Sequence, residues 1–292
     1  MKEQAVTLQI IKSGLLTLVQ DGGRLGQQAF GLPTGGVMDR RAAATANWLT
    51  GQPEDYPVLE ITLQGPEIQF DGSLQIAITG ADLSPTIDEV PVANYQTLDV
   101  KEGQTLRFGA ARSGCRAYLA IRGRWQIKEW LGSFSGLAVA GKYWPPGSRL
   151  EKDTRINIWP GEPLAARKLS SREQPHHSHE LSVRVMEGPE VDWFPASAIQ
   201  FFTSHAFTVG PDSNRMGYRL RENLPDYQPQ LELISSGIVP GTIQVLPAGN
   251  PVVLLADAQT SGGYPRLGNV LSRDLDFLAQ LVPGDRIRFV MV

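Results

Sequence analysis

The sequence has a single cysteine, Cys115, so no disulfide can form within the chain. This cysteine usage favours a reducing compartment, and we expect a cytoplasmic protein. Long apolar runs are also missing, since no stretch approaches the roughly 20 residues that a membrane helix needs. The early pair Ile10-Ile11 is followed at once by Lys12. We therefore expect no membrane partner and no signal peptide of ordinary design.

An excess of positive charge is absent as well. Lys and Arg number 27 against 30 Asp and Glu, which leaves a net charge of -3. No basic field exists to attract a polyanion, so nucleic acid is not an expected partner. Three histidines, His176, His177 and His179, lie in one polar stretch without companion ligands at metal-binding spacing. We expect no metal site there.

Glycine and proline are plentiful, at 30 and 21 of the 292 residues, which suits a β-rich protein with many turns. Short apolar runs bounded by Gly, Pro, Asp or Asn are typical of strands. Clear examples are residues 74–78, 118–121, 183–186 and 252–255. The composition and the spacing together predict a mainly β chain built of closed barrels with a few short helices.

Helical spacing is limited to three segments. Residues 39–50 place apolar side chains on one face, with Asp39 as a candidate N-cap and Gly51 as a stop. Residues 273–281 show the same spacing, with Ser272 as a candidate N-cap. A shorter helix is predicted within residues 191–199.

A polar stretch, RKLSSREQPHHSHE at residues 167–180, predicts a linker between two halves, residues 1–166 and 181–292. The halves share two short echoes in the same order. GPEI at residues 65–68 matches GPEV at 188–191, and GQTLRF at 103–108 matches GDRIRF at 284–289. We interpret the echoes as a duplication of one barrel, with chance similarity of two common hairpins as the alternative.

The densest group of polar side chains follows the apolar run at residues 252–255, in the sequence DAQTSGGYPR. Asp257 could act as a general base or orient a polar substrate, and Gln259 and Thr260 are further catalytic candidates. The glycine pair would permit positive φ angles and a close ligand approach. The substrate-binding candidates here are Gly262, Gly263, Tyr264 and Arg266. The alternative is a tight hairpin whose Asp and Thr satisfy turn backbone groups.

Two other segments could bind an anion. In NRMGYR, two arginines four residues apart suit a carboxylate or phosphate. In QDGGR, a predicted strand enters a Gly-rich turn that could cradle an anion, although it lacks the lysine and Ser/Thr of a P-loop. The substrate-binding candidates are Arg215, Tyr218 and Arg219 in the first segment, and Gln20, Asp21 and Arg24 in the second. Surface arginines and a structural turn are the alternatives.

Taken in chain order, these segments resemble the biotin-dependent carboxyltransferase-like family. That family includes the C subunit of 5-oxoprolinase, the second subunit of allophanate hydrolase, the carboxyltransferase part of urea carboxylase and an antagonist of a sporulation-kinase inhibitor. The resemblance implies two cyclophilin-like β-barrel domains. The strings that carry it are LLTLVQDGGRLGQQAFGLPTGGVMDRRAAATANWLTGQ, LEITLQGPEIQF, SNRMGYRL and SSGIVPGTIQVLPAGNPVVLLADAQTSGGYPRLGNVLSRDLDFLAQLVPGDRIRF.

For a stand-alone bacterial member, the resemblance implies ATP-dependent opening of 5-oxo-L-proline to L-glutamate, with ATP as co-substrate and subunits A and B as partners. One segment departs from the family pattern Gly-Ser-Arg-Ser-Thr, because residues 132–136 read GSFSG and place Phe134 and Gly136 there. Two other functions therefore stay open. One is a regulatory protein that antagonises a kinase-inhibitor-like partner, and the other is a carboxyltransferase or amide hydrolase component for a urea-like substrate.

Overall fold

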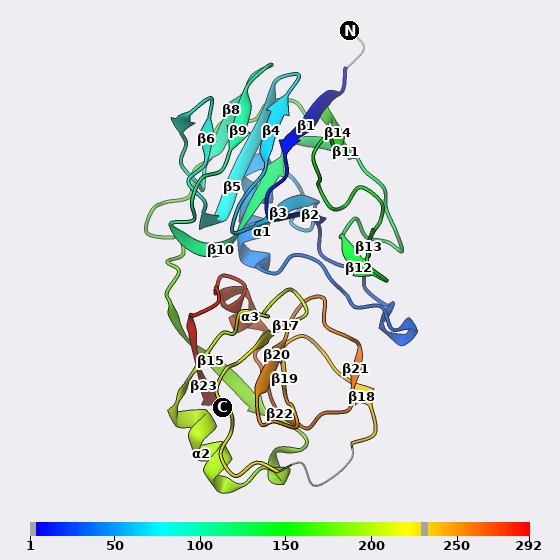
Figure 1. Ribbon diagram of the computed structural model, residues 1–292. Helices are drawn as coiled ribbons and strands as arrows, with labels where there is room; N and C mark the ends of the chain where they lie inside the picture. The colour runs from blue at the N-terminus through cyan, green and yellow to red at the C-terminus, as the bar shows by residue number, and fades with distance from the viewer. Residues whose placement is uncertain (1–3, 229–232) are drawn as a thin grey trace. The chain divides into compact units, whose positions relative to one another are not determined.

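The computed structural model describes residues 4–228 and 233–292, and its chain divides into two compact units (Figure 1). The first unit comprises Met1–Arg24 and Asp39–His177, and the second comprises Leu25–Met38 and Ser178–Val292. The division differs from the predicted boundaries, because the Gly-rich segment Leu25–Met38 groups with the second unit. Within the described residues, no helix is long and apolar enough to cross a membrane.

Two large sheets and one two-stranded sheet are described in the first unit. The seven-stranded sheet has the order β11-β14-β1-β4-β9-β6-β7, the five-stranded sheet has the order β2-β3-β10-β5-β8, and β12 pairs with β13. The bounds are β1 (Val6–Lys12), β2 (Leu16–Gln20), β3 (Val58–Thr62), β4 (Glu67–Phe70), β5 (Leu74–Asp82), β6 (Thr86–Ile87), β7 (Val90–Pro91), β8 (Thr97–Val100), β9 (Thr105–Arg107), β10 (Ser113–Ile121), β11 (Gly123–Gln126), β12 (Leu137–Val139), β13 (Lys142–Trp144) and β14 (Arg155–Pro160).

The core of the first unit draws on both of its large sheets. In β1, Leu8 and Ile10 are fully buried while the residue between them is only partly covered, as expected for a strand with one face inward. Ile76 and Ile78 of β5 and Leu119 of β10 join the same cluster from the other sheet. Each such side chain contributes about 1.5–3 kcal/mol through burial.

One helix, α1 (Arg40–Thr50), covers part of the five-stranded sheet of this unit. The Asp39 side chain accepts a hydrogen bond from the Ala42 backbone N–H at 2.9 Å, and Gly51 ends the helix in the left-handed conformation. The Thr79 hydroxyl of β5 donates to the Ala42 carbonyl at 2.7 Å. The predicted helix at residues 39–50, its cap and its stop are therefore confirmed.

The second unit contains a seven-stranded sheet in the order β16-β23-β15-β22-β19-β20-β17, and β18 pairs with β21. Its two end strands also meet each other. Val209 and Leu220 form an isolated bridge, and the Gly210 N–H donates to the Arg219 carbonyl at 2.7 Å. The sheet therefore curls back onto itself, which removes exposed edges. The bounds are β15 (Glu180–Glu187), β16 (Ala206–Thr208), β17 (Gly217–Arg219), β18 (Ser236–Gly237), β19 (Thr242–Val245), β20 (Pro251–Leu254), β21 (Ser261–Gly262), β22 (Arg266–Val270) and β23 (Arg286–Met291).

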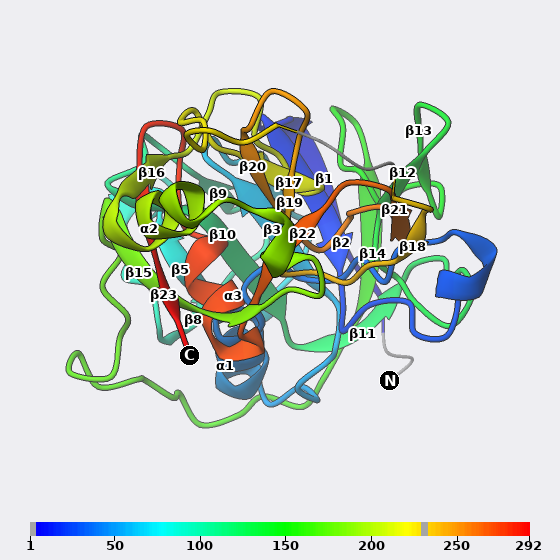
Figure 2. The same ribbon diagram turned by 90° about the horizontal axis from the view of Figure 1, so that it is seen from below.

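Short helices close the second core. α2 (Ala196–Ser204) packs against β23 (Figure 2), and α3 (Ser272–Leu278) contributes Leu278 to the core. The prediction of Ser272 as an N-cap is wrong, because Leu271 takes the cap position and Ser272 is the first helical residue. The segment predicted at 191–199 is two pieces, η2 (Val191–Trp193) and the start of α2. A further short turn, η1 (Gln28–Phe30), lies in the segment Leu25–Met38.

The two sequence echoes differ in whether the repeated motif has the same local structure in both units. Gly103 and Gly284 both have positive φ angles, with open space where a Cβ would stand, and each lies in the turn before a strand. By contrast, Glu67 begins a strand, whereas Glu190 follows β15 and precedes a 3-10 turn. Only the second echo therefore has the same local structure in both units, and the duplication stays a prediction.

The stretch predicted as a linker is not a free tether. Residues at its start bond to the first unit, since the Arg167 carbonyl accepts from the Thr97 N–H at 2.8 Å and the Leu169 N–H donates to the Tyr95 carbonyl at 2.9 Å. Its last residue, Glu180, already begins β15. The change from the first unit to the second falls between residues 177 and 178.

Candidate functional site

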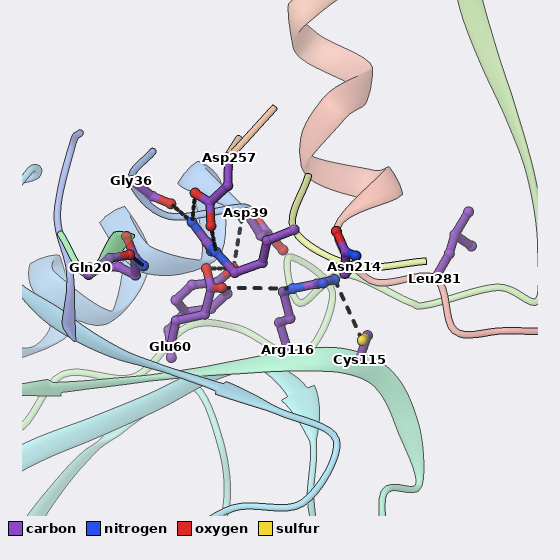
Figure 3. Close-up of polar contacts among 12 residues, drawn as sticks. Gln20, Gly36, Asp39, Glu60, Cys115, Arg116, Asn214, Asp257 and Leu281 are labelled. Atoms are coloured by element: carbon purple, nitrogen blue, oxygen red, sulfur yellow. Dashed lines mark hydrogen bonds and ion pairs between the residues drawn. The ribbon is translucent and has the colours of Figure 1, made fainter. Parts of the chain in front are cut away.

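An ion pair in the second unit joins two of the predicted site segments. The Arg215 guanidinium donates to both carboxylate oxygens of Asp257, from Nε to Oδ2 and from Nη2 to Oδ1, each at 2.8 Å (Figure 3). The same Nη2 donates to the Gly36 carbonyl at 2.7 Å. The Arg215 side chain is 6% exposed and that of Asp257 10%. This planar two-point contact is the strong form of an arginine–carboxylate pair.

The backbone around the ion pair explains why these side chains meet. The Leu255 N–H donates to the Met216 carbonyl, and the Asp257 N–H donates to the Arg215 carbonyl, both at 3.0 Å. The two segments thus run together like strands beyond the end of β20. The Gly35 N–H donates to the Ala256 carbonyl at 3.1 Å and brings in the segment Leu25–Met38.

Glycine is required at the base of this arrangement. Gly35 and Gly36 have φ angles of 64° and 85°, in the left-handed region that favours glycine. Asp257 Oδ1 lies 3.6 Å from the position that a Cβ on Gly35 would occupy. The general-base role of Asp257 stays a prediction. Because both of its oxygens bond to Arg215, the geometry favours a positioning role.

A hollow of about 160 Å³ in the second unit is bordered by residues from both of the segments that the ion pair joins. It brings together three of the predicted site residues, Arg219, Gln259 and Tyr264, and Asn214 and Met216 border it. The other lining residues are Asp212, Gly217, Gln244, Leu246, Val252 and Leu254. A concave site with an apolar floor and a few polar groups is the usual form of a small-molecule site.

Gln244 is the residue of this hollow that the sequence did not single out. The residue is 2% exposed, and the hydrogen bonds of its side-chain amide are long. The amide nitrogen donates to the Tyr264 carbonyl at 3.4 Å, and the amide oxygen accepts from the Gln259 amide at 3.5 Å. It sits in β19 among apolar neighbours, where one glutamine in a strand is normally taken for an outward, solvated position.

Gly262 and Gly263 do not have the positive φ angles expected of them. Glycine is needed at these two positions because a larger side chain would not fit. A Cβ on Gly262 would stand 2.5 Å from the Gln244 amide nitrogen, and one on Gly263 would stand 3.0 Å from the Leu233 carbonyl oxygen. Thr260 is partly covered, and its carbonyl accepts from the Ile238 N–H at 3.0 Å. These three residues hold β21 close to its neighbours, and their roles toward a substrate stay predictions.

Two predicted binding residues are occupied by contacts inside the second unit. Arg266 pairs with Glu190, from Nε to Oε2 at 2.8 Å and from Nη2 to Oε1 at 2.5 Å. The guanidinium holds the pKa of Glu190 below its ordinary value, against the opposing effect of burial. The Tyr218 ring is buried in the core, and its hydroxyl donates to the Leu281 carbonyl at 3.2 Å. Direct substrate contact by Tyr218 is disfavoured by this burial.

In the first unit, Asp21 holds the loop whose sequence departs from the family pattern. Its carboxylate accepts from the Ser133 hydroxyl at 2.7 Å, from the Phe134 N–H at 2.6 Å and from the Ser135 hydroxyl. It also accepts from the Gly23 N–H at 2.9 Å. Four donors converge on one buried carboxylate, which is how a protein rigidifies a loop.

Gln20 and Arg24 hold the same loop from either side. The Gln20 amide donates to the Gly136 carbonyl at 2.9 Å. Arg24 donates to the Trp130 carbonyl at 3.1 Å and to the Ser135 carbonyl at 3.0 Å, and its guanidinium lies 4.5 Å from the centre of the Trp130 ring. Both side chains are fully buried, so the structure gives them a supporting role, and substrate binding by them stays a prediction.

The departure at residues 132–136 has a local explanation. Phe134 packs against the first core, where a charged side chain would be costly. Gly136 has no room for a Cβ, because the Ser148 hydroxyl oxygen lies 2.9 Å from where that atom would stand. Ser148 is itself 3% exposed. Ser148, from a different segment, therefore occupies the space that a side chain at position 136 would need.

A buried polar cluster in the first unit was missed by the sequence reasoning. The Tyr118 hydroxyl donates to Glu60 at 3.0 Å and accepts from the Asp39 N–H at 2.8 Å, and the Arg116 guanidinium lies 3.8 Å from Glu60. Arg116 also donates to the Cys115 sulfur at 3.5 Å (Figure 3). Burial raises the pKa of Tyr118 well above its ordinary value, and the Glu60 charge acts in the same direction. The signal in the sequence that could have revealed the cluster is a charged residue inside each of two apolar strands, Glu60 in β3 and Arg116 in β10.

Metal-ligating groups do not cluster in the part of the chain that the structure describes. Of the three neighbouring histidines, His179 contacts Asp285 through Nδ1 at 2.7 Å. Burial lowers the pKa of His177 below its ordinary value, which favours the neutral ring. Cys115 is buried, as expected for a small apolar side chain.

Comparison with known proteins identifies the family. Residues 30–291 match the family model described as carboxyltransferase domain, subdomain A and B. The chain is 35% identical to the C subunit of 5-oxoprolinase from Escherichia coli over 97% of its own length and 90% of the relative's. It is 31% identical to the corresponding 5-oxoprolinase subunit of Haemophilus influenzae, over 94% and 87% of the two lengths.

A solved structure carries the same architecture. The chain matches the urea carboxylase of Kluyveromyces lactis with a TM-score of 0.88 and 28% identity, covering 98% of this chain and 27% of that one. This solved structure agrees with the mainly β architecture predicted from the sequence. The family model and the two relatives agree with the family resemblance. The chain therefore belongs to the carboxyltransferase domain family, with its subdomains A and B.

Proposed function

We propose that the chain is a subunit of an ATP-dependent 5-oxoprolinase complex, which opens 5-oxo-L-proline to L-glutamate together with subunits A and B. The observation that carries the proposal is the 35% identity to the C subunit of 5-oxoprolinase, which extends over 97% of this chain and 90% of the relative. Relatedness of this extent supports a whole-protein correspondence rather than one shared module.

ATP consumption follows from the chemistry of the substrate. A lactam carbonyl is a poor electrophile until its oxygen is activated, for example by phosphorylation with release of ADP. Water then adds to the activated carbon, and the ring nitrogen departs as the amine, which leaves an acyl phosphate on the side-chain carboxyl of glutamate. A second water hydrolyses this acyl phosphate to glutamate and phosphate. We propose ATP as a co-substrate of the complex as a whole.

A second candidate function is a carboxyltransferase or amide hydrolase component for a urea-like substrate, which the likeness to urea carboxylase supports. The third is a regulatory protein without chemistry of its own. Both share the fold with the first candidate, so the fold alone does not separate them.

The test is reconstitution with the candidate partner subunits. The chain is purified with subunits A and B, and glutamate formation from 5-oxo-L-proline is followed with and without ATP. Our proposal expects ATP-dependent glutamate that is unaffected by avidin. Avidin-sensitive carboxyl transfer to urea would favour the second candidate. Complex formation without turnover of either substrate would favour the third.

A further inference from the structure

The hollow of the second unit lies on the outer face of its curled sheet. Tyr218 of β17 pairs with Val253 of β20, and both side chains are buried in the second core. Because side chains alternate along a strand, Arg219 and its partner Val252 stand on the opposite face. The Arg219 side chain therefore begins directly beside the apolar side chain of Val252 on this outer face.

Arg219 is available to a ligand. Its side chain is exposed, while its backbone N–H donates to the Ser213 hydroxyl and its carbonyl accepts from Gly210. Among the residues that the structure describes, no hydrogen bond or ion pair of its guanidinium is found, although Asp212 borders the same hollow. An arginine at the rim of a partly apolar site suits a carboxylate, which it can bind at two points.

Gln244 offers the second recognition element. Its amide is buried outside the barrel core, and its hydrogen bonds to the residues that the structure describes are long, at 3.4 Å and 3.5 Å, near the upper limit for a hydrogen bond. A primary amide presents one donor side and one acceptor side. It can therefore pair with the carbonyl and the N–H of another amide, and a ligand that does so would replace weak contacts with good ones.

The remaining walls suit a small ring. Val252 and Leu254 form the apolar floor, Leu246 lies beside them, and Tyr264 is 43% exposed. The volume of about 160 Å³ is below the range for drug-sized ligands and admits a single five- or six-membered ring.

We propose that this hollow binds a small cyclic amide bearing a carboxylate, with Arg219 on the carboxylate and Gln244 on the amide. The assignment rests on the proposed function, which supplies 5-oxo-L-proline as a molecule of this class. It makes Arg219 a specificity-determining residue of the substrate site.

Binding to the full chain tests the assignment by ligand-observed NMR. The probes are 5-oxo-L-proline, 2-pyrrolidone, which lacks the carboxylate, and urea. The variant is Arg219→Gln, and the matched control is Arg221→Gln, an exposed arginine two residues along that does not border the hollow. Thermal unfolding of both variants checks that the fold is kept.

We expect saturable binding of 5-oxo-L-proline that weakens about tenfold or more in Arg219→Gln and is unchanged in Arg221→Gln. Binding of 2-pyrrolidone should be weaker than that of 5-oxo-L-proline, and Arg219→Gln should not change its affinity. Three results would overturn the assignment: no saturable binding to the unaltered chain, equal binding of 5-oxo-L-proline by Arg219→Gln, or urea binding as tight as that of 5-oxo-L-proline.

Turnover by the reconstituted complex separates this inference from the proposed function. If the complex containing Arg219→Gln forms glutamate with an unchanged KM, the hollow is not the substrate site although the complex is a 5-oxoprolinase. If the complex with the unaltered chain forms no glutamate from 5-oxo-L-proline and ATP, the proposed function itself fails.

Discussion

Arg215 and Asp257 bind each other through two hydrogen bonds of 2.8 Å, across 42 residues of sequence. The pair is nearly buried, and the Gly36 carbonyl accepts a further hydrogen bond from the same guanidinium. Three segments of the second unit therefore depend on one ion pair. Two of those segments carry residues that border the hollow, so the pair links two of its walls.

Replacement of Asp257 should separate catalysis from assembly. In Asp257→Asn, one of the two acceptor oxygens is lost, so the segments that border the hollow are held less firmly. We expect glutamate formation by the reconstituted complex to fall about a hundredfold or more, while size-exclusion chromatography still shows the full complex. Near-normal turnover would remove Asp257 from the list of functional residues.

The carboxylate of Asp21 should govern the loop at residues 130–136. In Asp21→Ala, four donors lose their buried acceptor, and we expect a loss of about 3 kcal/mol in the free energy of unfolding. Hydrogen exchange should accelerate across the loop. Asp71→Ala is the control, because Asp71 is exposed and accepts from the Thr7 N–H in the same unit, and it should cost less than about 1 kcal/mol. Unchanged exchange in Asp21→Ala would contradict the supporting role.

The family's usual threonine should be incompatible with this chain at position 136. Gly136→Thr would press its Cβ against the Ser148 hydroxyl, so we expect a loss of about 2 kcal/mol of stability. The double variant with Ser148→Gly should recover part of that loss, because the obstructing side chain is removed. Urea unfolding of the single and double variants measures the coupling. Additive losses would show that Ser148 does not occupy the space that the threonine needs.

Glu190 should make a pH-dependent contribution to stability. Its pKa is lower in the folded chain than the ordinary value of 4.5, because Arg266 donates to the ionised carboxylate. The ion pair therefore stabilises the fold fully above about pH 4.5, and the contribution is lost as the pH falls through the lowered pKa. We expect Glu190→Gln to be about 2 kcal/mol less stable than the unaltered chain near neutral pH.

The measurement is the unfolding free energy of both proteins at several pH values, with Glu187→Gln as an exposed control on β15. The difference caused by Glu190→Gln should shrink on acidification, whereas that of Glu187→Gln should stay small throughout. A difference that remains constant or grows below about pH 4.5 would refute the assigned ion pair.

The sequence predicted those elements whose ends are set by interactions between residues close together in the chain. Asp39 and Gly51 delimit α1 because a cap and a left-handed stop act on adjacent residues. Residues 191–199 were not resolved into two pieces, although Pro195 is well placed to precede a helix. Contacts between distant segments were not predictable. The bridge between Val209 and Leu220 and the grouping of Leu25–Met38 with the second unit depend on tertiary packing.

The candidate site was predicted by residue type more than by role. Arg215 and Asp257 were both identified, but their pairing was not, because spacing alone does not reveal which charges meet. Arg266 was expected at a substrate and instead meets Glu190, 76 residues away. Gln244 was overlooked, since burial on the outer face of a sheet depends on the loop that covers it.

The most direct test of the central claim is glutamate production from 5-oxo-L-proline by the complex of all three proteins, followed by NMR together with ADP release. We predict that glutamate and ADP appear together, and that omission of this chain, of either partner or of ATP stops both. Absence of glutamate with all three proteins and ATP present, or undiminished glutamate when this chain is omitted, would contradict the assignment.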